Sequence, residues 1–154
     1  MEGVSPALEK ARSRTPRSVL FMCRMNAVRS PMAETLARSL LPAGTYVASA
    51  GIRPGERDPF VDAVLGEVGL SLGRHAPHSL DELEDDYFDL IVTLAPEAHH
   101  AALELTRSMA VDVMYWPTPD PAVATGTRDQ IMHSYREVRE HLKLLIEKRL
   151  KGPG

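Results

Sequence analysis

The chain has 154 residues, 44% of them hydrophobic and 25% charged, a single cysteine, and a formal net charge of −3. This length suits one domain, and a lone cysteine excludes a scaffold of intramolecular disulfides. The composition shows neither the clustered basic surface of a nucleic-acid-binding protein nor an apolar run long enough to span a bilayer. We therefore expect a cytoplasmic globular protein without nucleic-acid or membrane partners.

The first segment, residues 1–17, mixes serine, proline and arginine with few apolar residues. It lacks the apolar centre that a signal peptide needs, and we expect it to be a mobile leader. Residues 18–154 are expected to form the only domain.

Beyond the leader, apolar runs of strand length alternate with amphipathic stretches of helical spacing. We expect strands at 19–22, 45–50, 87–94 and 111–116. We expect helices at 31–41, 58–68, 96–107 and 127–150, with one acidic helical turn at 79–84. This alternation predicts an α/β fold: a single three-layer domain with a four-stranded parallel sheet flanked by helices on both faces.

Residues with capping chemistry mark the ends of these predicted helices. Pro31 suits the first turn of a helix, and Ser30 suits a position at its N-terminus. Asp58 is expected to cap the second helix, which Gly69 ends. The carboxyl ends of parallel strands share one edge of a sheet, so Cys23 and Asp120 are expected to meet there.

The loop between the first strand and the first helix carries the chemistry of the chain. It reads Cys23-Arg24-Met25-Asn26-Ala27-Val28-Arg29-Ser30. A loop of this length can curl into a cup with inward backbone N–H groups, toward which the next helix directs its positive end. We expect such a cup to bind a tetrahedral oxyanion and to stabilise a thiolate. A lone cysteine is often a buried structural residue, but this context favours a nucleophile.

Particular loop residues have distinct expected contributions. Arg29 offers a planar, bidentate grip on two oxygens of the anion, and Ser30 can donate its hydroxyl to the sulfur of Cys23. The remaining expected substrate-binding residues of the loop are Arg24, Met25, Asn26, Ala27 and Val28.

The segment VLFMCRMNAVRSPMAETLAR resembles the signature of the low-molecular-weight protein tyrosine phosphatases, whose relatives include phosphoarginine phosphatases and thioredoxin-coupled arsenate reductases. Later landmarks follow in matching order: Ser49-Ala50-Gly51, a glycine-containing segment ending at His75, and Asp120-Pro121. The resemblance runs from about Val19 to the end of the chain.

The resemblance implies a catalytic set and a function. Cys23 would attack phosphorus and form a cysteinyl-phosphate, Arg29 would bind the phosphate, and Asp120 would act as general acid and then base. The chain would thus be a metal-independent phosphatase without a cofactor, acting on a phosphorylated protein or a small phosphomonoester. Phosphate or sulfate would bind the same loop.

The resemblance also implies residues that support the loop. Asn26 would hold it together, in the left-handed conformation that asparagine tolerates. Ser49 and His75 would in turn support Asn26.

The chain departs from the tyrosine-specific members of that family in its pocket walls. Those members place aromatic side chains beside the acid, whereas residues 51–54 and 122–124 contain none here. Tyr115 and Trp116 are expected to pack in the core. The adjacent His99 and His100 point apart on a helix and are not expected to bind a metal. The natural substrate and the oligomeric state stay open.

Two other functions remain open at this point. One is arsenate reduction, which would need an external thiol such as glutathione, mycothiol or thioredoxin because the chain has one cysteine. The other is a non-catalytic anion-binding module that keeps the cup.

Overall fold

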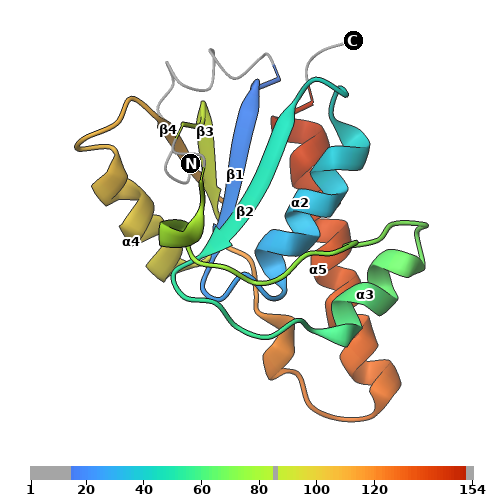
Figure 1. Cartoon of the computed structure of the whole chain (residues 1–154). Coiled ribbons are helices and arrows are strands. Elements are labelled where there is room, and N and C mark those ends of the chain that lie inside the picture. Colours follow the sequence, from blue (N-terminus) through green and yellow to red (C-terminus); the bar gives the residue numbers. More distant parts are fainter. Residues whose placement is uncertain (1–14, 85–86, 152–154) are drawn as a thin grey trace.

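The computed structural model describes residues 15–84 and 87–151, so most of the expected leader lies outside the described part of the chain. Its four parallel strands form one sheet in the order β2-β1-β3-β4 (Figure 1). They are β1 Ser18–Cys23, β2 Tyr46–Gly51, β3 Leu90–Thr93 and β4 Asp112–Tyr115. The helices are α2 Arg29–Leu40, α3 Pro59–Gly66, α4 Pro96–Leu105 and α5 Arg128–Arg149, with 3-10 turns at Leu80–Glu82 and Pro121–Val123. The expected three-layer α/β domain is confirmed.

The central strand β1 is buried along its whole length because it pairs with β2 on one side and β3 on the other. Its alternate side chains enter different layers, as the period of a strand requires. Val19 and Phe21 belong to one apolar cluster, while Leu20 and Met22 belong to another. A strand that is apolar on both faces is what a covered parallel sheet needs.

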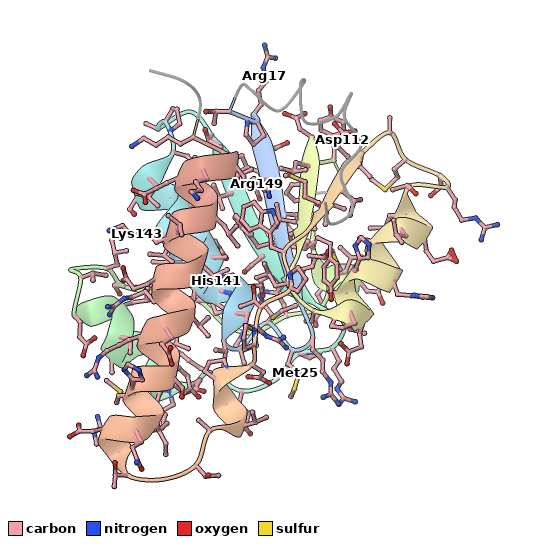
Figure 2. All side chains as sticks on the ribbon, turned by 180° about the vertical axis from the view of Figure 1, so that it is seen from behind. Arg17, Met25, Asp112, His141, Lys143 and Arg149 are labelled. Atoms are coloured by element: carbon pink, nitrogen blue, oxygen red, sulfur yellow. The ribbon has the colours of Figure 1, made fainter. Side chains whose placement is uncertain are left out.

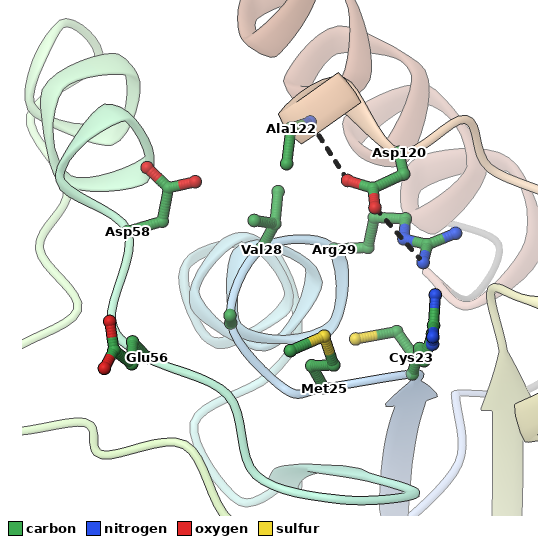
Figure 3. Close-up of a pocket in the computed structure, with 10 residues that line it drawn as sticks. Cys23, Met25, Val28, Arg29, Glu56, Asp58, Asp120 and Ala122 are labelled. Atoms are coloured by element: carbon green, nitrogen blue, oxygen red, sulfur yellow. Dashed lines mark hydrogen bonds and ion pairs between the residues drawn. The ribbon is translucent and has the colours of Figure 1, made fainter. Parts of the chain in front are cut away.

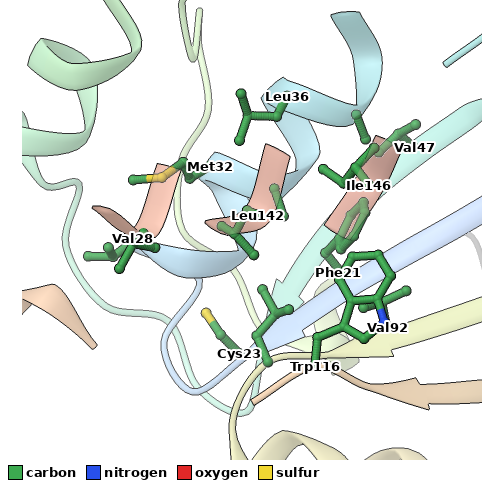
Figure 4. Close-up of a cluster of buried hydrophobic side chains, with 14 of the residues drawn as sticks. Phe21, Cys23, Val28, Met32, Leu36, Val47, Val92, Trp116, Leu142 and Ile146 are labelled. Atoms are coloured by element: carbon green, nitrogen blue, oxygen red, sulfur yellow. The ribbon is translucent and has the colours of Figure 1, made fainter. Parts of the chain in front are cut away.

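Helices α2, α3 and α5 cover one face of the sheet, and α4 covers the other (Figure 1). Figure 4 shows the larger core, where Met32 of α2 and Leu142 of α5 lie near Phe21 and Cys23. Trp116 also belongs to this core, with a ring 6.1 Å from that of Phe21. The nucleophile candidate is therefore seated on a packed, rigid layer.

Most boundaries differ from the expected ones by one to three residues, and two of them have identifiable local reasons. Helix α2 begins at Arg29, two positions before the expected start, and has no capping side chain because its N-cap residue, Val28, carries no acceptor. Strand β3 begins at Leu90 rather than at residue 87, since the carboxylate of Asp89 accepts the amide N–H of Arg17 at 2.8 Å.

The other caps follow the expected chemistry. Asp58 accepts the amide N–H of Phe60 at 2.8 Å and caps α3. Thr127 and Gln130 form a reciprocal capping box at the start of α5. In the described ranges 15–84 and 87–151, no helix is both long and apolar enough to cross a membrane.

The strand order reverses at β1, since one connection leads to β2 and the next strand, β3, lies on the opposite side. Open parallel sheets bind ligands at such a switch point, beyond the carboxyl ends of the strands. Cys23 ends β1 and begins this edge. Figure 2, drawn from behind, shows Met25 at this edge and Arg17 at the opposite end of the sheet.

Candidate active site

A pocket of about 200 Å³ lies at this edge of the sheet. Its lining residues are Cys23, Arg24, Met25, Ala27, Val28, Arg29, Glu56, Asp58, Asp120 and Ala122 (Figure 3). The structure therefore brings together seven of the residues expected in the site, from two segments about ninety positions apart. Asn26 and Ser30 are fully buried behind the lining.

Asn26 is the centre of the loop. It lies in the left-handed conformation, with φ of 55°, and is the one described non-glycine residue with positive φ. Its side-chain amide donates to Ser30 Oγ and to Ser49 Oγ, both at 2.9 Å. Its Oδ1 accepts the amide N–H of His78 at 3.1 Å. All three groups of the buried amide are therefore satisfied, and its orientation is determined.

The direction of these hydrogen bonds leads to Cys23. Cys23 Sγ lies 2.9 Å from Ser30 Oγ. Because that oxygen already accepts a hydrogen bond from the Asn26 amide, the single hydroxyl hydrogen of Ser30 is free to be donated to the sulfur. Such a donor stabilises the thiolate form over the thiol.

The other end of this chain of hydrogen bonds is a carboxylate. Ser49 accepts from Asn26 and donates its own hydroxyl to Glu34, a buried residue on α2. Arg38 pairs with Glu34 at 2.5 Å and neutralises it. An ionised Glu34 can only accept, which makes Ser49 its donor, and the Asn26 amide donates outward to Ser49 on one side and to Ser30 on the other.

Two histidines hold the loop from outside. His75 Nε2 lies 3.1 Å from the carbonyl oxygen of Asn26. His78 places Nε2 2.5 Å from the carbonyl oxygen of Ser49, and its own carbonyl accepts the amide of Gly51 at 2.9 Å. The expected supporting residues Ser49 and His75 thus both contact Asn26.

Gly51 permits the loop to approach β2 closely. A Cβ at this position would lie 2.7 Å from the backbone nitrogen of Asn26 and 2.8 Å from the backbone carbon of Met25. These distances are far shorter than real contacts with a Cβ. Glycine is therefore required here by space.

Arg29 joins the loop to the segment that carries Asp120. It donates from Nη1 to the carbonyl oxygen of Thr118 at 3.0 Å, and its Nη2 lies 4.0 Å from Asp120 Oδ2. The side chain of Arg29 is 11% exposed, whereas that of Asp120 is 40% exposed. Asp120 also accepts the amide N–H of Ala122 at 3.0 Å. Asp120, the candidate acid, thus lies at the solvent-exposed side of the pocket, next to the largely buried Arg29.

Sequence reasoning missed three contributors. Glu34 lies inside the quoted signature, but no role was expected for it. His78 lies three positions after His75, and only His75 was expected to support the loop. Glu56 lies in an irregular segment, and nothing in its neighbourhood along the chain indicates that it faces a pocket. Asp58 was expected only as a cap, yet it also lines the pocket.

The aromatic residues near the site pack away from it. Trp116 is buried, and Tyr115 stacks on His99 with ring centres 4.6 Å apart. Burial, and to a lesser degree the nearby His100, lowers the pKa of His99. In the part of the chain that the structure describes, no group of three or more potential metal ligands occurs. The pocket lining contains no aromatic side chain among the described residues.

The fold, with a cysteine-to-arginine loop between β1 and α2, defines an α/β protein built around an anion-binding loop. A family model described as low molecular weight phosphotyrosine protein phosphatase matches residues 18–151, and the chain belongs to this family.

Several relatives illustrate the range of this family. An arsenate reductase from Staphylococcus aureus is 29% identical over 132 residues, which cover 86% of this chain and 95% of that protein. The structure of an arsenate reductase from Archaeoglobus fulgidus is 31% identical, with a TM-score of 0.62 over 84% of this chain and 98% of that one. A tyrosine phosphatase from Escherichia coli K30, solved in complex with sulphate, shares the fold at 19% identity, with a TM-score of 0.69 over 87% and 96%.

Proposed function

We propose that this chain is a metal-independent phosphatase acting on phosphomonoesters. The observation that carries the proposal is the buried network of hydrogen bonds that links Glu34, through Ser49, Asn26 and Ser30, to Cys23 Sγ, in a pocket shared with Arg29 and Asp120. A sulfur supplied with a hydroxyl donor, beside a guanidinium, suits attack on an anionic phosphoryl group. A tyrosine phosphatase with the same fold was solved in complex with sulphate, which is in keeping with such an anion site.

In the first step, the Cys23 thiolate attacks phosphorus, and the bond between phosphorus and the substrate oxygen breaks. Asp120 in its protonated form gives its proton to that leaving oxygen. Arg29 and the first turn of α2 stabilise the charge on the phosphoryl oxygens. The product is a cysteinyl-phosphate.

In the second step, Asp120, now a carboxylate, takes a proton from water while the water oxygen attacks phosphorus. The bond between sulfur and phosphorus breaks, which releases inorganic phosphate and restores the thiolate. The Ser30 hydroxyl donates to the departing sulfur and lowers the energy of this step.

Arsenate reduction is the second candidate, favoured by the names of the relatives at 29% and 31% identity. The thiolate of Cys23 would form a bond to arsenic with loss of water. An external thiol would then attack Cys23 Sγ, so that the electron pair of the sulfur–arsenic bond reduces As(V) to As(III) and a mixed disulfide forms. A second external thiol would restore Cys23, because the chain has no other cysteine.

The test is hydrolysis of para-nitrophenyl phosphate in metal-free buffer near pH 6, by the wild type and the variants Cys23→Ser and Asp120→Ala. We expect Cys23→Ser to abolish turnover and Asp120→Ala to lower kcat by about 10²- to 10³-fold. The loss in Asp120→Ala should be larger for phenyl phosphate, whose leaving oxygen is more basic. Absence of turnover in the reduced wild type would overturn the proposal. Reduction of arsenate with added thiols would then identify a reductase, and phosphate binding alone would identify an anion-binding module.

A further inference from the structure

Apart from Asp120, which lies 4.0 Å from Arg29, the charged residues of the pocket are divided between two sides. Cys23 and Arg29 lie on one side, and the carboxylates of Glu56 and Asp58 lie on the opposite wall (Figure 3). Arg24 adds a second cation on the side of the loop. Only the first side attracts a purely anionic ligand electrostatically. The second wall is unfavourable to an anion and favourable to a cation.

Glu56 is available to a ligand. It is exposed, and its side chain makes no hydrogen bond or ion pair within the described residues. The adjacent Arg57 does not neutralise it, because that guanidinium is bound to both carboxylate oxygens of Asp62 at 3.1 and 2.7 Å. Arg57 also donates to the carbonyl oxygen of Gly73 at 2.8 Å.

Asp58, by contrast, is held in place. Its Oδ1 accepts the amide of Phe60, and its Oδ2 accepts the hydroxyl of Tyr135 at 2.6 Å. Burial, together with the hydrogen bond to Asp58, raises the pKa of Tyr135 well above its ordinary value. Tyr135 thus stays a donor, and Asp58 is a carboxylate with a determined position that needs no rearrangement when a cation arrives.

The surface between the two charged sides is apolar. Met25, Val28 and Ala122 line it, and Met25 is 37% exposed. A Cβ on Gly55 would lie 3.0 Å from both Cβ and Cε of Met25, so the backbone of Gly55 packs against this side chain. A ligand that spans the pocket would therefore meet an anion site, then an apolar strip, then a pair of carboxylates.

We propose that the pocket selects phosphomonoesters whose organic part carries a cationic group beyond an apolar or aromatic spacer, with Glu56 and Asp58 as the residues that determine this specificity. The inference rests on the proposed phosphatase function and refines its substrate class. The cation can be the ammonium of a small phosphomonoester or a basic side chain next to a phosphorylated residue, since an ammonium or guanidinium group is recognised in both.

The experiment compares matched substrates of the full chain. Phosphotyramine carries an ammonium group, and 4-ethylphenyl phosphate has nearly the same shape without it. A pair of phosphotyrosine peptides, with lysine or glutamate beside the phosphotyrosine, tests the second source. The quantity measured is the ratio of kcat/KM within each pair, at low and at high ionic strength.

We expect the wild type to prefer the cationic member of at least one pair by about three- to tenfold, and high salt to reduce this preference. Glu56→Gln should lower the ratio, and Glu56→Lys should bring it to one or below. Glu147→Gln, which removes an exposed carboxylate far along α5, should keep the ratio of the wild type. If only phosphotyramine is preferred over its neutral partner, the natural substrate is a small phosphomonoester. If only the lysine peptide is preferred over the glutamate peptide, the natural substrate is a phosphorylated protein.

Equal kcat/KM values within both pairs, with normal hydrolysis of para-nitrophenyl phosphate, would overturn this inference and leave the phosphatase proposal intact. If no substrate is hydrolysed, calorimetric binding of phosphotyramine and 4-ethylphenyl phosphate to Cys23→Ser still decides it. Tighter binding of phosphotyramine, reduced by Glu56→Gln, would support the cationic specificity without turnover. Equal affinities would reject it.

Discussion

The phosphate-binding loop, residues 23–30, and the acid segment, residues 118–124, adjoin each other at the pocket, but they are held in different ways. The loop is fastened by a buried network in which Asn26 alone makes four hydrogen bonds with Ser30, Ser49, His75 and His78. The acid segment is held at Thr118, which is buried and accepts a hydrogen bond from Arg29, whereas Val123 further along is 78% exposed.

This contrast indicates how the two segments share the chemistry. Charge stabilisation requires donors that are in place before the reaction, so a loop with satisfied buried polar groups suits an anion cradle. A general acid must reach leaving groups of different shape, and a segment whose tip is exposed allows this. Arg29 connects the two, because it belongs to the loop and donates to Thr118.

The largest effect is expected from the residue that connects the two segments. Arg29→Lys should lower kcat for para-nitrophenyl phosphate by about 10²- to 10³-fold, since lysine cannot grip two phosphoryl oxygens while it also binds Thr118. Steady-state kinetics and urea unfolding measure activity and stability separately. A loss of less than tenfold would mean that the loop and the acid segment do not depend on this guanidinium.

A glycine substitution tests whether the loop is as closely fitted as its contacts indicate. Gly51→Ala places a Cβ against the backbone of Asn26 and should lower the free energy of unfolding by about 1–3 kcal/mol, with a loss of kcat. Urea denaturation measures the first and steady-state kinetics the second. Gly44→Ala is the matched control, since nothing lies within 4 Å of a Cβ there. Equal stabilities of the two variants would contradict the close fit.

His78 allows a smaller perturbation of the loop. His78→Gln removes the imidazole beside the carbonyl oxygen of Ser49 but keeps the backbone bonds to Asn26 and Gly51. We expect a loss of about 1 kcal/mol in the free energy of unfolding, measured in urea. His133→Gln, at an exposed position of α5, should change it by a few tenths at most. If the two variants are equally stable, the ring of His78 does not support the loop.

The smallest effect concerns the helices beside the acid segment and appears as a pH dependence. Hydrogen bonds from Arg136 and Arg139 of α5 lower the pKa of Glu67 to about 2, below its ordinary value of 4.5. A carboxylate with a lowered pKa stabilises the fold above pH 4.5, and this contribution is lost as the pH falls from about 4.5 toward 2.

Urea unfolding of the wild type and Glu67→Gln between pH 6 and pH 3 measures this contribution. The wild type should be slightly more stable at pH 6. The difference should shrink toward pH 3, because Glu67 of the unfolded chain binds a proton below about pH 4.5 whereas Glu67 of the folded protein stays ionised down to about pH 2. Such exposed ion pairs contribute little. A difference that stays constant with pH would show that the charge of Glu67 does not tie α3 to α5.

Much of the fold could be predicted from periodicity and capping chemistry. Alternating apolar strands and helices gave the correct class and the order of elements, because burial on both faces of a parallel sheet demands apolar runs. Boundaries were less accurate where a side chain serves another purpose. Ser30 suits a helix N-terminus in isolation, but it lies inside the first turn, where its hydroxyl bonds Cys23 and Asn26, and the N-cap residue is Val28, which has no acceptor.

The catalytic candidates were accessible from the sequence because Cys23, Arg29 and Ser30 lie within eight residues, and a short loop before a helix restricts where they can lie. The place of Asp120 followed from the rule that parallel strands end at one edge, and its expected role as the acid followed from the family resemblance. These are local or topological constraints, which the order of residues expresses directly.

What only the tertiary structure decided is the network behind the loop and the charge of the wall opposite it. Glu34 and Ser49 lie 15 positions apart, and His78 lies 52 positions from Asn26. Glu56 faces the anion site, and no periodic pattern in the sequence indicates this position. The sequence by itself determined the layered fold and the nucleophilic loop, since both follow from short-range spacing and apolar period. The direction of the hydrogen bonds and the second, acidic side of the pocket depend on which distant segments meet, and that follows from packing alone.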